Sequence, residues 1–249
     1  MLLVFFINSK NVTTIKNNYI HVNINNKSLF LVIYGGYNQI QLALIGPEIK
    51  TIHTENHKNA SKNILIILDE MLKKHNKKLW DCAFIAVYQG PGPYTTLRTV
   101  IATVNGLAFA TKIPLLGING LETFVQENHS ASYTATIALL NAFGKDVYYG
   151  IYTEKDQTMV TGCLPFDDFV QQIQNIITNN PTAKIKCIGN AVLLYRQELI
   201  EKCGNNLIFP EPLPLQSSLE GIIQEAQKKW HFQENISEQL MPLYLKKSL

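Results

Sequence analysis

Three glycine-containing turns are the parts of this 249-residue chain that are best suited to bind an anion. They are, in chain order, Gly35-Gly36, Gly90-Pro91-Gly92 and Gly189-Asn190-Ala191. Glycine lets the backbone approach a ligand closely, and the amide groups of such turns form anion-binding concavities. A protein that gripped a nucleotide would use all three turns together. Each turn alone is a weak signal, because many joints between a strand and a helix carry glycine.

Two histidines, His53 and His57, have a spacing that would suit a metal ion. Residues four apart lie on one face of a helix, where two imidazole rings can share a zinc ion. Glu55 does not stand where an H-E-x-x-H motif requires it, and residues 51–59 are polar and loop-like. We therefore predict solvated histidines and no metal site. The sequence also contains no P-loop, nucleophile elbow or dinucleotide fingerprint, so we predict no catalytic and no cofactor-binding residue.

The glycine turns lie between predicted strands and helices. Apolar runs predict strands at residues 29–34, 37–45, 82–88, 115–118, 133–141, 147–153 and 184–189. Apolar residues three and four apart predict helices at residues 59–74, 95–111, 166–178, 191–202 and 217–229. The stretch 82–118 is thus predicted to run as strand, glycine-proline loop, helix and strand.

The two helices on either side of the glycine-proline loop carry candidate contact surfaces. On the helix at 95–111, small residues recur every four positions, and the helix at 59–74 has a broad apolar face. The candidate residues are Ala102, Gly106 and Ala110 on the former helix and Ile64, Leu68 and Met71 on the latter. Small residues let a second helix approach closely, and apolar area supplies burial. Each surface packs either on the chain's own sheet or on a partner, and the pattern allows both.

The composition is that of a globular protein, with 46% hydrophobic and 16% charged residues. The net charge of +3 is too small to mark a dedicated nucleic-acid binder. The four cysteines form no C-x-x-C pair, which predicts reduced thiols in a cytoplasmic protein. The apolar run at residues 1–7 is too short to span a membrane and lacks the features of a signal peptide, so no membrane association is predicted.

Residues 89–124 (QGPGPYTTLRTVIATVNGLAFATKIPLLGINGLETF) resemble the glycine-proline loop and following helix of the TsaB family, which takes part in tRNA threonylcarbamoyladenosine biosynthesis. The loop residues that fit the family pattern are Gly90, Pro91, Gly92, Thr95 and Arg98. The chain departs from the pattern at Pro93, Tyr94 and Thr96. Residues 241–246 (MPLYLK) resemble a second family motif near the C-terminus.

The resemblance implies an α/β fold of the actin-like ATPase type, related to ribonuclease H, in which two lobes have mixed sheets flanked by helices. It implies an N-terminal extension at 1–28, a first lobe at 29–122 and a second, degenerate lobe at 123–249 with a C-terminal helix and tail. The family has an aspartate where this chain has Tyr34, and actin-like ATPases use a carboxylate there in the magnesium shell. Its replacement argues against ATP hydrolysis.

The function that the resemblance implies is that of a non-catalytic scaffold subunit for modifying the adenosine 3′ of a tRNA anticodon. Its implied partners are a TsaD-like catalytic subunit and a TsaE-like ATPase, with a homodimer as a further arrangement and with tRNA contacted only indirectly. TsaB proteins use the two long helices of the first lobe for this contact, which makes the six candidate residues a predicted partner interface. The alternative is a nucleotide-binding enzyme of the actin-like superfamily, TsaD-like or kinase-like, that acts alone through its glycine turns.

Overall fold

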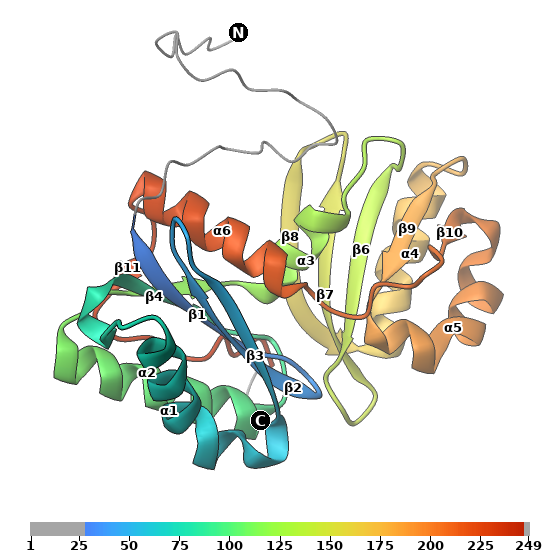
Figure 1. Cartoon of the computed structure of the whole chain (residues 1–249). Helices are drawn as coiled ribbons and strands as arrows, with labels where there is room; N and C mark the ends of the chain where they lie inside the picture. Colours follow the sequence, from blue (N-terminus) through green and yellow to red (C-terminus); the bar gives the residue numbers. More distant parts are fainter. Residues whose placement is uncertain (1–27, 247–249) are drawn as a thin grey trace, which may run out of the picture.

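The structure is a computed structural model that describes residues 28–246, apart from the side chains of residues 57, 58, 60 and 61. Two mixed sheets, each flanked by helices, make up this part of the chain (Figure 1). The prediction of an α/β fold with two lobes is therefore confirmed. The expected N-terminal extension at 1–28 lies outside the described residues, except for its last residue.

The first sheet has the strand order β11-β5-β4-β1-β2-β3. Its strands are β1 (Leu29–Gly35), β2 (Gln39–Ile45), β3 (Lys50–Asn56), β4 (Cys82–Tyr88), β5 (Leu115–Ile118) and β11 (Ile236–Ser237). Strand β1 lies in the middle, antiparallel to β2 and parallel to β4. Every residue of β1 is buried, because helices cover both faces of the sheet.

Three helices sandwich the first sheet (Figure 1). Helices α1 (His57–Lys74) and α2 (Tyr94–Thr111) lie on one face, and α6 (Leu219–Phe232) lies on the other. Because successive side chains of a strand point to opposite faces, Leu31 packs toward α1 and α2 while Phe30 packs toward α6. The ring of Phe84 stacks on Phe30 and on Trp230, at centroid distances of 4.7 and 4.5 Å, which fixes α6 to the sheet.

The prediction of a loop at residues 51–59 is wrong for most of that segment. Residues 50–56 form β3, which pairs antiparallel with β2 from Ile45↔Lys50 to Gln39↔Asn56. Strand β3 is an edge strand, and its residues alternate between exposed and half-buried. Polar side chains suit this position, since they discourage an exposed edge from pairing with another chain.

The second sheet has the strand order β10-β9-β6-β7-β8. Its strands are β6 (Ala135–Asn141), β7 (Asp146–Thr153), β8 (Thr158–Pro165), β9 (Ile185–Ile188) and β10 (Leu207–Ile208). Helices α4 (Phe166–Asn179) and α5 (Asn190–Cys203) cover one face, and α3 (Gly120–Asn128) covers the other. Helix α3 also contacts α6, so it links the two lobes. Among residues 28–246, no helix has the length and apolar character needed to cross a membrane.

The C-terminal segment returns to the first lobe, which corrects the expected boundary of the second lobe. Helix α6 and strand β11 both belong to the layers of the first sheet. Asn105 on α2 exchanges two hydrogen bonds with the backbone of Leu240, each 2.9 Å long, and the N–H of Leu243 donates to the Gln89 carbonyl at 2.9 Å. The second sheet thus ends at β10, and the residues after it that form α6, β11 and the tail complete the first lobe.

Candidate functional site

The second-to-last residue of the first strand is a tyrosine, near the point where the two lobes meet. Tyr34 is 1% exposed, and its hydroxyl donates a hydrogen bond to the Ser217 carbonyl at 2.9 Å. Its ring lies edge-on to that of Tyr88, with 4.8 Å between centroids. Burial raises the pKa of Tyr34 well above its ordinary value, against a smaller opposing effect of the hydrogen bond to Ser217, so the side chain is neutral. A neutral phenol provides no carboxylate for the shell of a magnesium ion.

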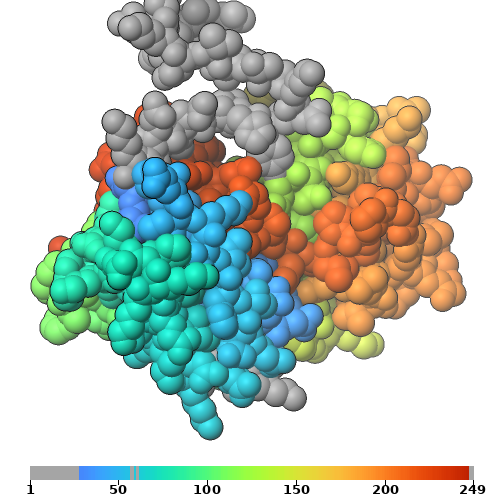
Figure 2. All heavy atoms as spheres, viewed as in Figure 1, coloured from blue at the N-terminus to red at the C-terminus, as the bar shows by residue number. Residues whose placement is uncertain are grey.

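The segment between α5 and α6 covers the first and third glycine turns. The N–H groups of Gly189 and Asn190 donate to carbonyls at residues 214–215, at 2.8 and 2.9 Å. Just after the first turn, the N–H of Tyr37 donates to Oε1 of Gln216 at 3.2 Å. Figure 2 shows this segment and α6, in orange and red, between the two lobes. Backbone amides that would hold a phosphate are therefore bonded to atoms of the chain itself.

The glycine-proline loop is also folded in on itself. Gly90 and Pro91 are buried, and Gly92 is half-buried. The Gly90 carbonyl accepts a hydrogen bond from the N–H of Gly120 at 2.8 Å, and the Pro91 carbonyl accepts one from the Tyr88 hydroxyl at 2.6 Å. Gly90 has a φ of +110°, a conformation that residues with a Cβ rarely adopt, so glycine is required at this turn.

The two remaining predicted loop residues, Thr95 and Arg98, are exposed at the start of α2. The Arg98 guanidinium lies 5.0 Å from the centroid of the Tyr94 ring and donates to the Tyr94 hydroxyl at 2.7 Å. The structure thus divides the predicted loop set into a buried turn and an exposed pair. Only the exposed pair has the accessibility that contact with another molecule requires.

The two histidines with metal-like spacing do not share a helix. His53 lies on β3, and His57 is the first residue of α1. In the part of the chain that the structure describes, no three His, Cys, Asp or Glu side chains are grouped so as to hold a metal ion. The spacing argument assumed a single helix, and the strand β3 removes that assumption.

Helix α1 buries the three residues that were predicted to contact a partner. Ile64, Leu68 and Met71 are 2, 3 and 5% exposed and belong to the core between α1, α2 and the first sheet. The apolar side chains that α1 exposes are Leu65 and Ile66, at 55 and 58%. The interface prediction for α1 is corrected accordingly: the buried set packs on the chain's own sheet, and only Leu65 and Ile66 are free to meet a partner.

Helix α2 exposes the predicted small residues. Ala102, Gly106 and Ala110 all lie at the surface, and a Cβ built on Gly106 would meet no atom within 4 Å. Phe109, beside this stripe, is 78% exposed. Helices α1 and α2 contact each other and cover the same face of the sheet (Figure 1), so their exposed residues lie on the same side of the first lobe. We call it the α1–α2 face, and it comprises Leu65, Ile66, Ala102, Gly106, Phe109 and Ala110.

Sequence reasoning left three residues of the α1–α2 face, Leu65, Ile66 and Phe109, out of the candidate contact set. A signal was present in the run of consecutive apolar residues at 64–68, because a helix that packs on a sheet buries only one stripe. When five apolar residues follow one another, that stripe can bury only some of them, and the others must be exposed. For Phe109 the signal is its position next to Ala110, outside the three-and-four pattern of the buried set.

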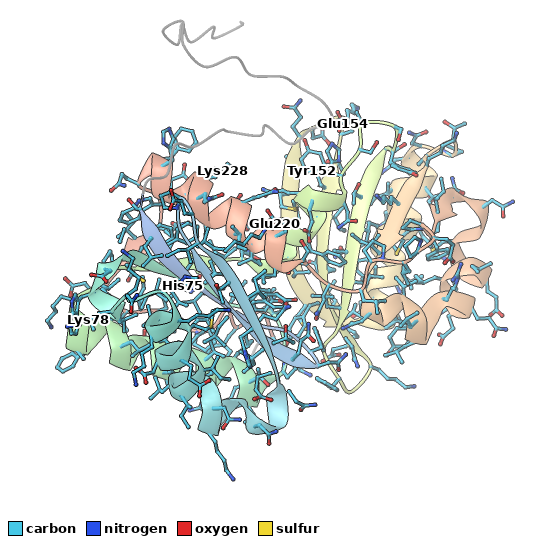
Figure 3. The ribbon with its side chains drawn as sticks, in the orientation of Figure 1. His75, Lys78, Tyr152, Glu154, Glu220 and Lys228 are labelled. Atoms are coloured by element: carbon cyan, nitrogen blue, oxygen red, sulfur yellow. The ribbon has the colours of Figure 1, made fainter. Side chains whose placement is uncertain are left out.

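Basic residues gather at the C-terminal end of α1 and beyond. Lys73, Lys74, Lys77 and Lys78 are all exposed. The Lys73 ammonium lies 2.6 Å from Asp69, and that of Lys78, labelled in Figure 3, lies 5.1 Å from the centroid of the exposed Trp80 ring. Cations at a helix C-terminus also complement the helix dipole. Both arrangements fit a solvated helix end.

Comparison with protein families matches residues 50–242 to the family described as TsaD: tRNA N6-adenosine threonylcarbamoyltransferase. A tRNA threonylcarbamoyladenosine biosynthesis protein TsaB of Buchnera aphidicola subsp. Schizaphis graminum is 28% identical over 100 residues, which are 40% of this chain and 48% of that protein. The TsaB protein of Escherichia coli is 28% identical over 93 residues, 37% of this chain and 40% of that protein. A tRNA N6-adenosine threonylcarbamoyltransferase of Onion yellows phytoplasma is 29% identical over 118 residues, 46% of this chain and 49% of that protein. The matched part of the chain spans about half the length of these curated relatives or less.

Two solved structures from Pseudomonas aeruginosa share the fold. YeaZ has a TM-score of 0.63 at 22% identity, over 88% of this chain and 100% of that one. A protein described as similar to peptidase YEAZ has a TM-score of 0.65 at 21% identity, with the same coverage. At this identity the likeness establishes the fold alone, and the predicted actin-like ATPase fold is confirmed.

Proposed function

We propose that this chain, which belongs to the TsaD family of tRNA N6-adenosine threonylcarbamoyltransferases, is a non-catalytic scaffold subunit in the formation of threonylcarbamoyladenosine in tRNA. Its partner would be a TsaD-type catalytic subunit, with a TsaE-type ATPase joining the pair. In this role the chain contacts tRNA only through the complex. The similarity to TsaB proteins, which are named for this biosynthesis, supports the proposal.

The observation that carries the proposal is the α1–α2 face. Two branched aliphatic side chains and an aromatic ring are exposed on these two helices, together with a stripe of small residues, and contiguous apolar patches on a protein surface mark interaction sites. The open space above Gly106 would let a partner helix come close to the backbone of α2. Phe109 would then supply a large apolar anchor at the edge of the contact.

The residues where the two lobes meet support a non-catalytic role. Tyr34 replaces the carboxylate that an actin-like ATPase needs, and its hydroxyl is bonded to the Ser217 carbonyl. The amides of Gly189 and Asn190 are bonded to carbonyls of the chain. An enzyme acting alone would have to break these contacts before it could grip a nucleotide. The second candidate function, a nucleotide-binding enzyme, is therefore the less favoured one.

Reconstitution of the modification with purified proteins tests the proposal. The reaction contains substrate tRNA, the small-molecule substrates and the TsaE-type ATPase, and it is run with this chain alone, with the TsaD-type subunit alone and with both. We expect threonylcarbamoyladenosine only when both are present. Replacing Leu65 by Glu should abolish product formation by the two subunits together, because the contact would desolvate the new charge. The control is Leu194→Glu, at a residue of α5 with a similar exposed fraction, and it should leave product formation unchanged.

Product formed by this chain alone would overturn the scaffold role. A titration of the isolated chain with ATP and magnesium separates the two candidate functions in the same preparation. Saturable binding by the isolated chain would favour the enzyme. Absence of binding, together with activity that requires both subunits, is the outcome that the scaffold role predicts.

A further inference from the structure

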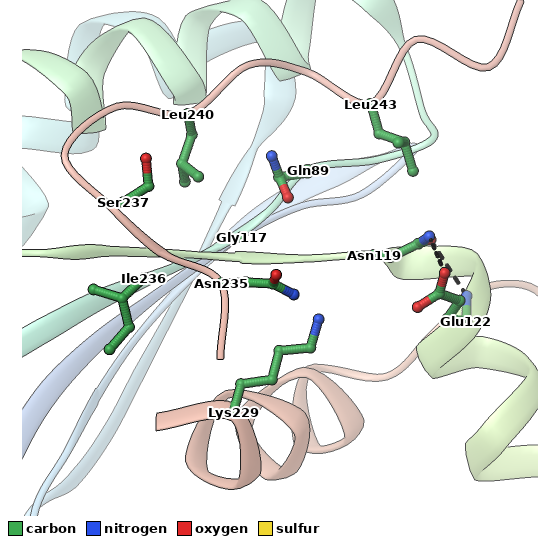
Figure 4. Close-up of a pocket in the computed structure, with 10 residues that line it drawn as sticks. All are labelled: Gln89, Gly117, Asn119, Glu122, Lys229, Asn235, Ile236, Ser237, Leu240 and Leu243. Atoms are coloured by element: carbon green, nitrogen blue, oxygen red, sulfur yellow. Dashed lines mark hydrogen bonds between the residues drawn. The ribbon is translucent and has the colours of Figure 1, made fainter. Parts of the chain in front are cut away.

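A cavity of about 430 Å³ opens in the first lobe, on a side that α1 and α2 do not line. Strands β4 and β5 end at it, the first turn of α3 and the last turns of α6 border it, and residues 235–243 close it (Figure 4). Its volume lies in the range of pockets that hold small molecules, roughly 300–1,000 Å³. Neither the α1–α2 face nor the covered glycine turns at 35–36 and 189–191 contribute to it, so the cavity is a separate site.

Lys229, on α6, is the feature that sets this cavity apart. It is 8% exposed, and among the residues that the structure describes it is the one charged residue that is fully buried. Its ammonium points into the cavity (Figure 4), and no described residue forms a hydrogen bond or ion pair with it. The apolar stem of Lys229 is packed against the chain while its ammonium stays open to the cavity, where an anionic group can pair with it.

Two carboxamides face the same space. Nε2 of Gln89 donates to the Met241 carbonyl at 2.8 Å, which fixes the amide plane. Gly117 lies directly beneath, where a Cβ would come within 2.0 Å of Oε1 of Gln89, so only glycine leaves room for this amide. Asn235 lines the cavity from the opposite side, and no described residue bonds its side chain. Donors and acceptors are thus available to polar atoms of a ligand.

A carboxylate also lines the cavity and limits the charge of the ligand. Glu122 accepts a hydrogen bond from Nδ2 of Asn119 at 2.8 Å and lies in the first turn of α3, where the helix dipole favours a negative charge. It makes no ion pair with Lys229. One ammonium and one carboxylate leave the lining close to neutral. Glu122 opposes further negative charge, so a ligand with a single carboxylate is better tolerated than a phosphate dianion.

The wall formed by the C-terminal segment is held in place before any ligand arrives. Asn105 bonds both backbone groups of Leu240, and the N–H of Leu243 donates to the Gln89 carbonyl. A site that is formed in advance loses less conformational entropy when it binds. These contacts make the cavity a built feature and not a chance gap between loops.

We propose that this cavity binds a small polar monocarboxylate, whose carboxylate pairs with the Lys229 ammonium and whose hydroxyl or amino group meets the amides of Gln89 and Asn235. The site belongs to the isolated chain. It is independent of the scaffold role, since none of its residues lies on the α1–α2 face.

Titration of the ¹⁵N-labelled full chain, followed by NMR of the side-chain amides of Gln89 and Asn235, tests the proposal. The probes are L-lactate and L-serine as polar monocarboxylates, lactamide as the matched neutral compound, and inorganic phosphate as the dianion. We expect saturable shifts with at least one of the two carboxylates and none with lactamide. Phosphate should bind at least about tenfold more weakly than the carboxylate.

Two variants decide the role of the ammonium. Lys229→Met keeps an unbranched apolar stem and removes the charge, and it should weaken carboxylate binding by about tenfold or more. Lys228→Met changes the neighbouring exposed lysine, labelled on α6 in Figure 3, and should bind as the unchanged protein does. The melting temperature of Lys229→Met should stay about the same, because methionine keeps the buried apolar stem and the ammonium has no partner in the described chain to lose.

The proposal is overturned by any of four results. These are the absence of a saturable shift with either carboxylate, equal binding by Lys229→Met, tighter binding of phosphate, and a large drop in the melting temperature of Lys229→Met. The last result would mean that the ammonium has a structural partner. None of these results bears on complex formation with a TsaD-type subunit, so the scaffold role is tested separately.

Discussion

Tyr34 limits the chemistry that is possible at the junction between the lobes, because it places a phenol there and not a carboxylate. A carboxylate at a position that is 1% exposed would require a metal ion or a cation to offset its desolvation. A phenol requires only one acceptor, and the Ser217 carbonyl supplies it. The same hydrogen bond ties β1 to the segment just before α6. One side chain thus offers no carboxylate at this position and fastens the segment that covers the glycine turns.

Glu127 predicts a pH dependence of stability. Burial raises the pKa of Glu127 to about 7, against the opposing effect of two hydrogen bonds from Ser218, at 2.7 and 2.6 Å. Because this pKa is higher in the folded chain, the contribution to stability is complete below pH 4.5 and is lost as the pH rises through about 7. We expect the free energy of unfolding to fall by on the order of 2 kcal/mol from this group between pH 5 and pH 8.

Urea denaturation at several pH values measures this effect. The Glu127→Gln variant has no titrating side chain at this position, so the free energy of unfolding of the variant should change less over the same pH range. Glu220→Gln is the matched control, because Glu220 lies in the first turn of α6 but is largely exposed beside Lys50. Equal pH dependence in the original chain and in Glu127→Gln would contradict the assigned role.

The C-terminal segment is an element whose position depends on a few polar contacts. It has little regular structure beyond the two residues of β11, and Asn105 on α2 holds it through the backbone of Leu240. Replacing Asn105 by Ala leaves two half-buried backbone groups without partners, and each such group costs about 1–3 kcal/mol. We expect faster hydrogen exchange at the Leu240 and Leu243 amides and a lower free energy of unfolding.

Exchange followed by NMR or mass spectrometry checks this expectation. Asn205→Ala, at an exposed position after α5, serves as the control and should leave exchange in the tail unchanged. If the Leu240 amide of Asn105→Ala exchanged as slowly as before, the two hydrogen bonds of Asn105 would not be what holds the C-terminal segment.

Five of the six α-helices that the structure describes, and most of the buried strands, were predictable from the sequence because their signals are local, whereas α3 was missed. The helix at 95–111 and the strand at 115–118 agree with α2 and β5, since periodicity and Pro114 define them. Strand β3 was missed because an edge strand is polar and its pairing with β2 is not written in a local pattern. The sequence also offers no sign that Asn105 meets Leu240, because their contact depends on the path of the whole chain.

The candidate sites were likewise predictable only where a local sequence pattern identifies them. The exposed small residues of α2 were predicted from spacing, but the outward side of α1 was not, because several adjacent apolar residues compete for one buried stripe. Lys229 could not be singled out at all. Its burial arises only when α6, β5 and the C-terminal segment come together.

In the whole molecule, the glycine turns at 35–36 and 189–191 are covered, and a different side exposes apolar residues. The segment before α6 lies between the lobes and bonds the glycine turns, while the α1–α2 face exposes apolar residues to solvent. A chain organised in this way is suited to bind another protein. The central claim is therefore that the α1–α2 face is a partner interface.

Sedimentation velocity of this chain mixed with the TsaD-type subunit, with and without Gly106→Leu, tests that claim most directly. A Cβ at this open position would meet no atom within 4 Å, and leucine is a better helix former than glycine, so the isolated variant should be more stable by up to about 1 kcal/mol. In the complex the same side chain would fill the space for a partner helix, so we predict that the variant no longer forms the heterodimer. A stabilised variant that still binds the TsaD-type subunit as tightly as the original chain would contradict the claim.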